Sequence, residues 1–254
     1  MEGHFLKEDV MKTLSFALMM LSLISLSGCN TEDAVQDTVK DNIGIVETTP
    51  ETDAKDNEQD INEKVTTVSP LALEEYLQPF DDYSWEMTEK PEYVMLHFTS
   101  AVVLSKEEPY DIKTVRGIFE ENSLSIHYII DREGVIHCWL PETRAAWHAG
   151  KGTFNNDERL TNAMNKYSIG IEMLAIGSKK DMAQYLTDEE YDTLPKELIG
   201  YTEAQYESLG KLVRDICSRN GIPFDETHVI GHDMYNPAKT DPGELFDWSR
   251  LFPQ

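Results

Sequence analysis

Apolar and polar residues follow regular patterns mainly in the C-terminal part of the chain. Short apolar runs at residues 92–100 and 168–174 predict interior β-strands, because a strand covered on both faces shows little polar alternation. Two further runs, at 125–130 and 135–140, flank a polar stretch that contains Gly134 and predict a β-hairpin. The two strands of the hairpin should be neighbours in the sheet.

Apolar residues at helical spacing predict two helices. The first covers residues 114–122, and the longer one covers 202–220, where Thr202 can cap the first turn and Gly221 ends the helix. Residues 224–230 then predict a last strand. Strands interleaved with helices predict one α/β domain, with a mixed central sheet flanked by helices.

The start of the chain has a different pattern. Lys12 precedes an apolar run at 14–26 and then small residues, which is typical of a secretory signal peptide over residues 1–28. The apolar run is shorter than the roughly 20 residues of a membrane-spanning helix. Acidic residues before Met11 fit a signal peptide poorly, so Met11 is a candidate initiator.

A cysteine follows this signal. Leu26-Ser27-Gly28-Cys29 resembles the lipobox of bacterial lipoproteins, in which the cysteine becomes the lipidated N-terminus. The resemblance implies export and a membrane anchor at Cys29, with the protein facing the cell wall. An ordinary signal peptide, with Cys29 incidental, is the alternative. Residues 29–70 are acidic and lack aromatic residues, which predicts a disordered tether of about 35 Å before a folded domain over 71–254.

Charge and cysteine content narrow the possible partners. The formal net charge of −25 argues against nucleic acid and against anionic membrane surfaces, which both attract clustered Lys and Arg. Membrane contact should therefore come only through the lipid. Of the 3 cysteines, Cys138 falls in a strand pattern and Cys217 in a helical one, and we expect both to be buried and unpaired.

Several residues could form a hydrolytic metal site, which uses three protein ligands and one open position for water. His97 lies near the end of a predicted strand, and His232 and Asp241 follow the last one. Their spacing excludes a shared helix face, so a strand end and a returning loop would have to bring them together. Glu172 stands inside an apolar run, and Lys239 shortly precedes Asp241. Spacing alone does not decide between a site and scattered polar residues.

The order of six segments is more specific. Together they resemble the zinc-dependent N-acetylmuramoyl-L-alanine amidases of the amidase-2 family, which are related to phage lysozyme-type amidases and peptidoglycan-recognition proteins. The resemblance spans about residues 91–250, essentially the whole predicted domain. The segments are LHFTS at 96–100, SIHYIIDREG at 125–134, AWHAG at 146–150, SIGIE at 168–172, YTEAQY at 201–206 and GHDMYNPAKTDPG at 231–243.

The resemblance implies a role for each matching residue. His97, His232 and Asp241 match the zinc ligands, Glu172 matches the carboxylate that activates water, and Lys239 matches the lysine that stabilises the oxyanion. Amide hydrolysis needs a nucleophilic water, a base and positive charge at the developing oxyanion, so the three roles are chemically consistent. The implied reaction cuts the bond between N-acetylmuramic acid and L-alanine in peptidoglycan or muropeptides.

The chain departs from the family pattern at two places. Ile126 stands where the phage branch has a tyrosine, so proton transfer would depend on Glu172. The interval from His232 to Asp241 is one residue shorter than in many relatives. The alternative function is a peptidoglycan-binding lipoprotein without catalysis, because binding relatives keep the groove but lose a ligand.

Four further residues are candidates for the substrate groove. His148 matches a loop that lines the groove in relatives, and its neighbour Trp147 belongs to the same segment. Arg144 and Asn165 are polar residues near these segments. The alternatives are packing for His148 and Trp147 and simple solvation for Arg144 and Asn165.

We expect the remaining histidines of the domain to have structural roles. His127 shares a strand face with Ser125 and Ile129, which favours packing or a contact behind the metal ligands. His137 and His228 should be structural as well.

Overall fold

The structure is a computed structural model that describes residues 68–76 and 80–253. The predicted signal peptide, Cys29 and nearly all of the predicted tether lie outside these residues. Ser69 is buried, and its backbone N–H donates to the Tyr128 hydroxyl at 2.9 Å. The chain therefore already packs on the domain two residues ahead of Leu71.

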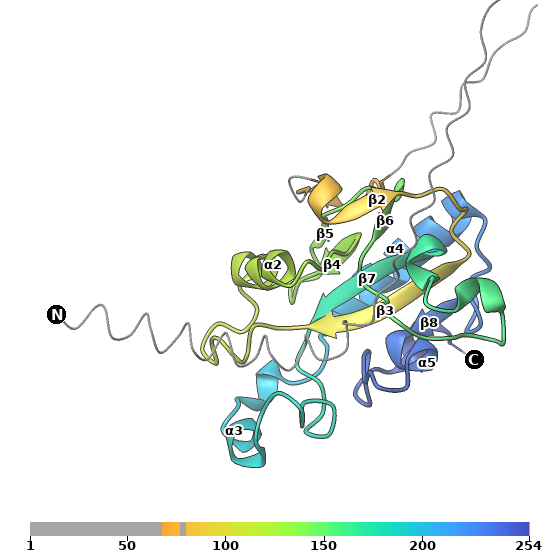
Figure 1. Cartoon of the computed structure of the whole chain (residues 1–254). Helices are drawn as coiled ribbons and strands as arrows, with labels where there is room; N and C mark the ends of the chain where they lie inside the picture. The colour runs from red at the N-terminus through yellow and green to blue at the C-terminus, as the bar shows by residue number, and fades with distance from the viewer. Residues whose placement is uncertain (1–67, 77–79, 254) are drawn as a thin grey trace, which may run out of the picture. The chain divides into compact units, whose positions relative to one another are not determined.

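A six-stranded mixed sheet forms the centre of the domain, as predicted (Figure 1). The strands in order are β1 (Leu73–Glu74), β5 (Ile136–Cys138), β4 (Tyr128–Ile130), β7 (Ser168–Leu174), β3 (Tyr93–Thr99) and β8 (Val229–Gly231). β4 and β5 are antiparallel and form the predicted hairpin, whereas the other neighbours run parallel. Next to this sheet, β2 (Ser84–Glu86) and β6 (Arg144–Ala146) form a small antiparallel pair.

The two longest strands, β3 and β7, pair in parallel along their full length, with His97 opposite Glu172. Successive side chains on a strand point to opposite faces of the sheet. Val94, Leu96 and Ile171 belong to the core on one face, whereas His97 and Glu172 alternate with them and point to the other. The pairing register thus places both candidate site residues on one face.

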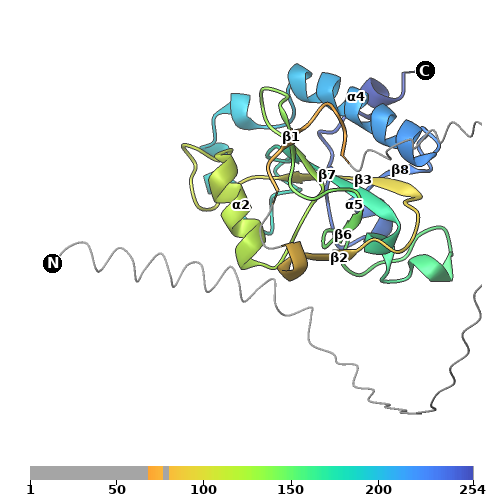
Figure 2. The same ribbon diagram turned by 90° about the horizontal axis from the view of Figure 1, so that it is seen from above.

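Helix α4 (Glu203–Asn220) covers the first face, and Figure 2 shows it on one side of the sheet with β2, β6 and α5 on the other. Thr202 and Gln205 form a reciprocal capping box, and Gly221 ends the helix in the left-handed conformation at φ 63°, as predicted. The apolar face of α4 packs against the sheet with Leu209, Leu212, Val213 and Ile216.

The remaining helices are shorter. Helix α2 begins earlier than the predicted 114–122, because Asp111 caps it by accepting from the backbone N–H of Thr114 at 2.9 Å. The helices are α2 (Ile112–Glu121), α3 (Asp188–Asp192), α5 (His232–Tyr235) and α6 (Trp248–Leu251), with 3-10 helices at Phe80–Asp82, Glu158–Leu160, Met164–Lys166 and Lys196–Leu198. None of the helices in residues 68–76 and 80–253 is both long and apolar enough to cross a bilayer.

The prediction of a strand over 224–230 was wrong for most of its length, because β8 begins only at Val229. Asp225 holds the preceding residues in a turn by accepting from the backbone N–H groups of Thr227 and His228 at 2.9 and 3.1 Å. A short polar side chain that bonds its own backbone competes with strand formation. Both predicted cysteines, Cys138 and Cys217, are buried and free, as expected.

Candidate metal centre

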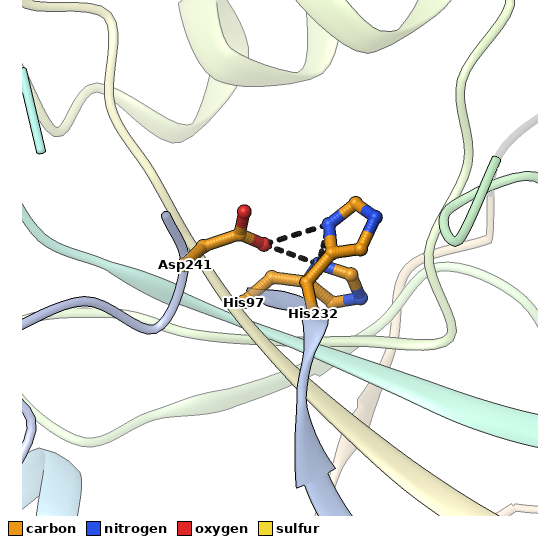
Figure 3. A group of neighbouring side chains, drawn as sticks. All are labelled: His97, His232 and Asp241. Carbon is orange, nitrogen blue, oxygen red and sulfur yellow. Dashed lines mark hydrogen bonds and ion pairs between the residues drawn. The ribbon is translucent and has the colours of Figure 1, made fainter. Parts of the chain in front are cut away.

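Three predicted ligands meet at the carboxyl ends of the central strands (Figure 3). His97 stands on β3, His232 is the first residue of α5 directly after β8, and Asp241 lies in the loop that follows α5. The Nδ1 atoms of His97 and His232 are 3.1 Å apart, and Asp241 Oδ2 lies 2.6 Å from the first and 3.0 Å from the second. The shortened interval between His232 and Asp241 therefore does not prevent the carboxylate from reaching both histidines.

The arrangement fits a zinc ion. Two imidazole nitrogens and one carboxylate oxygen within 4.8 Å of one another form the donor set of a catalytic zinc site, with a fourth position left for substrate or water. Burial lowers the pKa of His97 to about 4, so its ring is neutral. Burial opposes ionisation of Asp241, but its close contacts with His232 and His97 hold its pKa below the usual range. Neutral imidazoles and an ionised carboxylate are the forms that bind zinc.

Glu172 lies beside this cluster on β7, and only 8% of its surface is exposed. Its Oε2 atom is buried and has no hydrogen-bond partner among the described residues. Burial raises the pKa of Glu172 well above its ordinary value, the charge of Asp241 raises it further, and Lys239 opposes both. A buried carboxylate that no protein group satisfies is suited to accept a proton from a ligand or water.

Lys239 stands in the loop 236–243, two residues before Asp241. The loop is held by backbone hydrogen bonds, from Asp233 N–H to Asp241 O at 3.0 Å and from Lys239 N–H to Asn236 O at 2.9 Å. Lys239 is half-buried, and its ammonium makes no ion pair with any described residue. Its charge acts on both Glu172 and His97. The ammonium is thus close to the site and is available to a ligand.

Asp181 holds this loop from the connection between β7 and α3, and sequence reasoning missed it. Its Oδ2 accepts from the backbone N–H groups of Ser178 at 2.9 Å and Glu244 at 3.1 Å. Gly243 has a φ of +83°, and a Cβ there would lie 2.6 Å from the same oxygen. Nothing in the local sequence around Asp181 points to a loop so far along the chain, so only the fold reveals this contact.

Three of the four groove candidates hydrogen-bond other described residues through their side chains. The Arg144 guanidinium bonds Ser84 Oγ at 2.9 Å and Asp81 at 2.8 Å, which ties β6 to β2. The Asn165 Oδ1 atom accepts from the backbone N–H groups of His148 and Ala149 at 3.2 and 2.8 Å, so it supports the loop.

The two aromatic candidates on this loop differ. The ring of Trp147 is half-buried beside Trp85, with ring centroids 6.0 Å apart, and its indole nitrogen has no partner among the described residues. The two ring nitrogens of His148 bond His97 and Ser168. Of the four candidates, only Trp147 has a buried side-chain polar atom without a hydrogen-bond partner among the described residues.

The other residues weighed from the sequence occupy structural positions. His127 accepts from Gly170 N–H at 3.0 Å and donates to Arg144 O at 2.8 Å, which confirms a packing role. His137 bonds Glu75 and Asp131, and His228 bonds Asp225. Ile126 is fully buried in the core under α2.

Comparison with known proteins defines the class. The Amidase_2 family model, described as N-acetylmuramoyl-L-alanine amidase, matches residues 87–244, and the chain belongs to this family. The match contains the three candidate ligands, Glu172 and Lys239.

The names of individual relatives are more specific than the name of the family. The chain is 35% identical over 130 residues to the 1,6-anhydro-N-acetylmuramyl-L-alanine amidase AmpD of Enterobacter cloacae, covering 51% of this chain and 56% of that protein. To AmpD of Escherichia coli strain K12 it is 34% identical over 129 residues, covering 50% and 56%. The chain thus spans about half the length of the curated relatives it matches. The crystal structure of a selenomethionine AmpD derivative shares the fold, with a TM-score of 0.51, 22% identity and coverage of 74% and 96%.

Proposed function

We propose that this protein is a zinc-dependent amidase that hydrolyses the amide bond between N-acetylmuramic acid and L-alanine in peptidoglycan or its muropeptide fragments. The observation that carries the proposal is the convergence of His97, His232 and Asp241 beside the unsatisfied carboxylate of Glu172. Membership of the Amidase_2 family supports the same reaction. The names of the AmpD relatives support an N-acetylmuramyl-L-alanine substrate.

The residues of the site divide the chemistry of amide hydrolysis. His97, His232 and Asp241 would hold a zinc ion, which when bound supplies Lewis-acid polarisation and acidifies water. Glu172 accepts the proton of the attacking water and passes it to the leaving amine, because its buried Oε2 has no hydrogen-bond partner among the described residues and its pKa is raised above the ordinary value. Lys239 places positive charge where the tetrahedral oxyanion develops.

One experiment tests bond and metal together. The purified protein is incubated with defined muropeptides, with and without a zinc chelator, and the products are identified by mass. We expect free stem peptide and the corresponding muramyl sugar, loss of activity with chelator, and recovery on adding zinc. Products cut between sugars or between peptide residues would overturn the assignment. Binding without cleavage would instead support a peptidoglycan-binding lipoprotein.

We further propose that the protein is exported and anchored to the membrane through a lipid on Cys29. The lipobox-like sequence before Cys29 and the acidic stretch over 29–70 support this arrangement, in which the domain works at a distance from the membrane. Metabolic labelling with a palmitate analogue tests it. Label on the wild type and none on Cys29→Ala is the expected result, and label that survives the substitution argues against the anchor.

A further inference from the structure

His148 lies behind the metal ligands with both ring nitrogens engaged. Its Nδ1 lies 2.9 Å from His97 Nε2, the nitrogen of His97 that faces away from the cluster, and its Nε2 lies 3.3 Å from Ser168 Oγ. The rings of His148 and His97 meet edge to face, with centroids 5.1 Å apart and an interplanar angle of 88°. His148 therefore contacts a candidate zinc ligand directly and has no free nitrogen for the groove.

The contacts run from His97 through His148 and Ser168 to the Met164 carbonyl, and this carbonyl sets the direction of each hydrogen bond. Ser168 Oγ lies 2.8 Å from the Met164 carbonyl oxygen, which can only accept, so the single hydroxyl proton of Ser168 points there. Ser168 must then accept from His148 Nε2–H. With that nitrogen protonated in the neutral ring, His148 Nδ1 accepts from His97 Nε2–H. When a zinc ion is bound, His97 Nδ1, which lies 3.1 Å from His232 Nδ1 and 2.6 Å from Asp241 Oδ2, is then the nitrogen whose lone pair is available to the metal.

The same loop orients the second histidine ligand. His232 Nε2 lies 2.9 Å from the carbonyl oxygen of Ala149, so this nitrogen carries a proton, and Nδ1, which faces Asp241, is the nitrogen left to bind a zinc ion. Asn165 Oδ1 holds both His148 and Ala149 by their backbone N–H groups. Two adjacent residues therefore set the tautomers of both histidines from the side away from the metal.

The sheet leaves space for the His148 ring at one position. A Cβ at Gly170 on β7 would lie 2.8 Å from two atoms of that ring, so any larger residue there would displace it. Gly170 also donates its N–H to His127, which fixes the local backbone. The position of the His148 ring is thus determined by close packing as well as by hydrogen bonds.

We infer that His148 is a positioning residue of the metal centre, which holds the Nε2–H tautomer and the ring orientation of His97 so that Nδ1 is free to bind zinc. The inference rests on the zinc site of the proposed function. A metal-binding histidine usually has a hydrogen-bond partner on its other ring nitrogen. Removing that partner typically lowers metal affinity or activity 10–100-fold. His148 takes this role as a neutral imidazole whose own tautomer is set by Ser168 and the Met164 carbonyl.

The first test measures zinc affinity of the full chain by competition with a chelator, independently of activity. His148→Phe keeps a ring but removes the acceptor, and we expect zinc binding to weaken about 10–100-fold. His148→Asn retains an acceptor at the place of Nδ1, and affinity should recover to within a few-fold of wild type. His137→Phe is the matched control, because both ring nitrogens of His137 are also bonded, but to Glu75 and Asp131 and not to a candidate zinc ligand.

The second test detects the Nε2–H protons of the two histidine ligands by NMR. In the zinc-loaded wild type, the Nε2–H protons of His97 and His232 should give protected downfield NMR resonances. Ser168→Ala is a small change that should leave the protein folded. It should weaken zinc binding and speed exchange of the His97 proton, while the His232 proton stays protected by Ala149.

Wild-type affinity and an unchanged His97 resonance in both His148→Phe and Ser168→Ala would overturn the inference. It would equally fail if His137→Phe weakened zinc binding as much as His148→Phe. If the wild type binds no zinc, the proposed function fails, whereas zinc binding and amidase activity that survive His148→Phe unchanged remove only the positioning role.

Discussion

The two halves of the candidate site are built differently. His97 and Glu172 stand opposite each other on adjacent parallel strands, where the backbone ladder of β3 and β7 sets their separation. Lys239 and Asp241 stand in a loop whose position depends on contacts from distant segments. Tyr201 donates to Pro242 O at 2.5 Å, and Asp181 accepts from Glu244 N–H. The backbone of the strand half is fixed by the sheet, and only the His97 ring has a partner outside the two strands, whereas the loop half is only as precise as the side chains that hold it.

The largest effect should come from removing a ligand from either half. His97→Ala and Asp241→Ala should each lower the zinc content of the purified protein from about one ion to near zero and abolish hydrolysis, because three protein ligands are the minimum for a catalytic zinc site. Metal analysis after dialysis measures this. Zinc content that falls in His97→Ala but not in Asp241→Ala would remove the carboxylate as a ligand and confine the site to its histidines.

Glu172→Gln tests the strand half without touching a ligand. We expect kcat to fall about 10²–10⁴-fold with zinc content unchanged, because the amide keeps the shape of the side chain but cannot accept a proton. Muropeptide turnover and zinc content measured on the same sample check both parts. A variant with full turnover would exclude Glu172 as the base.

Lys239→Met is the corresponding change in the loop half. If Lys239 stabilises the oxyanion as proposed, loss of its charge should lower kcat about 10²–10³-fold and leave KM within a few-fold, because the charge acts mainly on the transition state. Steady-state kinetics on a defined muropeptide separate the two parameters. An unchanged kcat would mean that the lysine only holds the loop.

Asp181→Ala tests whether the loop half needs its outside support. The change leaves the N–H groups of Ser178 and Glu244 without their side-chain acceptor. We expect zinc affinity to fall about tenfold. Glu120→Ala, which removes a surface ion pair with Arg116, is the control and should leave zinc affinity unchanged. Equal affinity in Asp181→Ala and wild type would show that the loop keeps its geometry alone.

The smallest effect concerns the stability of the metal-free protein. The pKa of Glu172 is raised in the folded state, so the folded protein holds this proton more tightly than the unfolded chain and loses stability as the pH rises above about 4.5. Glu172→Gln removes that loss. Its metal-free form should melt above wild type at pH 8, with little difference at pH 4. A melting difference that does not depend on pH would contradict the raised pKa.

Predictions from local pattern succeeded where local chemistry decides the structure. The capping box at Thr202 and the left-handed end at Gly221 bound α4 as expected, because both depend on neighbours in the chain. The strand over 168–174 was predicted with the bounds of β7, because it is buried along its whole length. The strand over 224–230 was predicted wrongly, because Asp225 bonds its own backbone in competition with the sheet.

The candidate ligands could be chosen from the sequence because six segments in order resemble a family, and residue type determines which atoms can bind a metal. Their arrangement could not, because the residues come from β3, β7, α5 and a loop that meet only in the folded chain. His148 shows the difference best. Its segment suggested a contact with the substrate groove, whereas the tertiary structure turns its ring to His97 and Ser168. Hydrogen-bond direction depends on which atoms face each other across the fold, and side-chain chemistry alone does not contain that information.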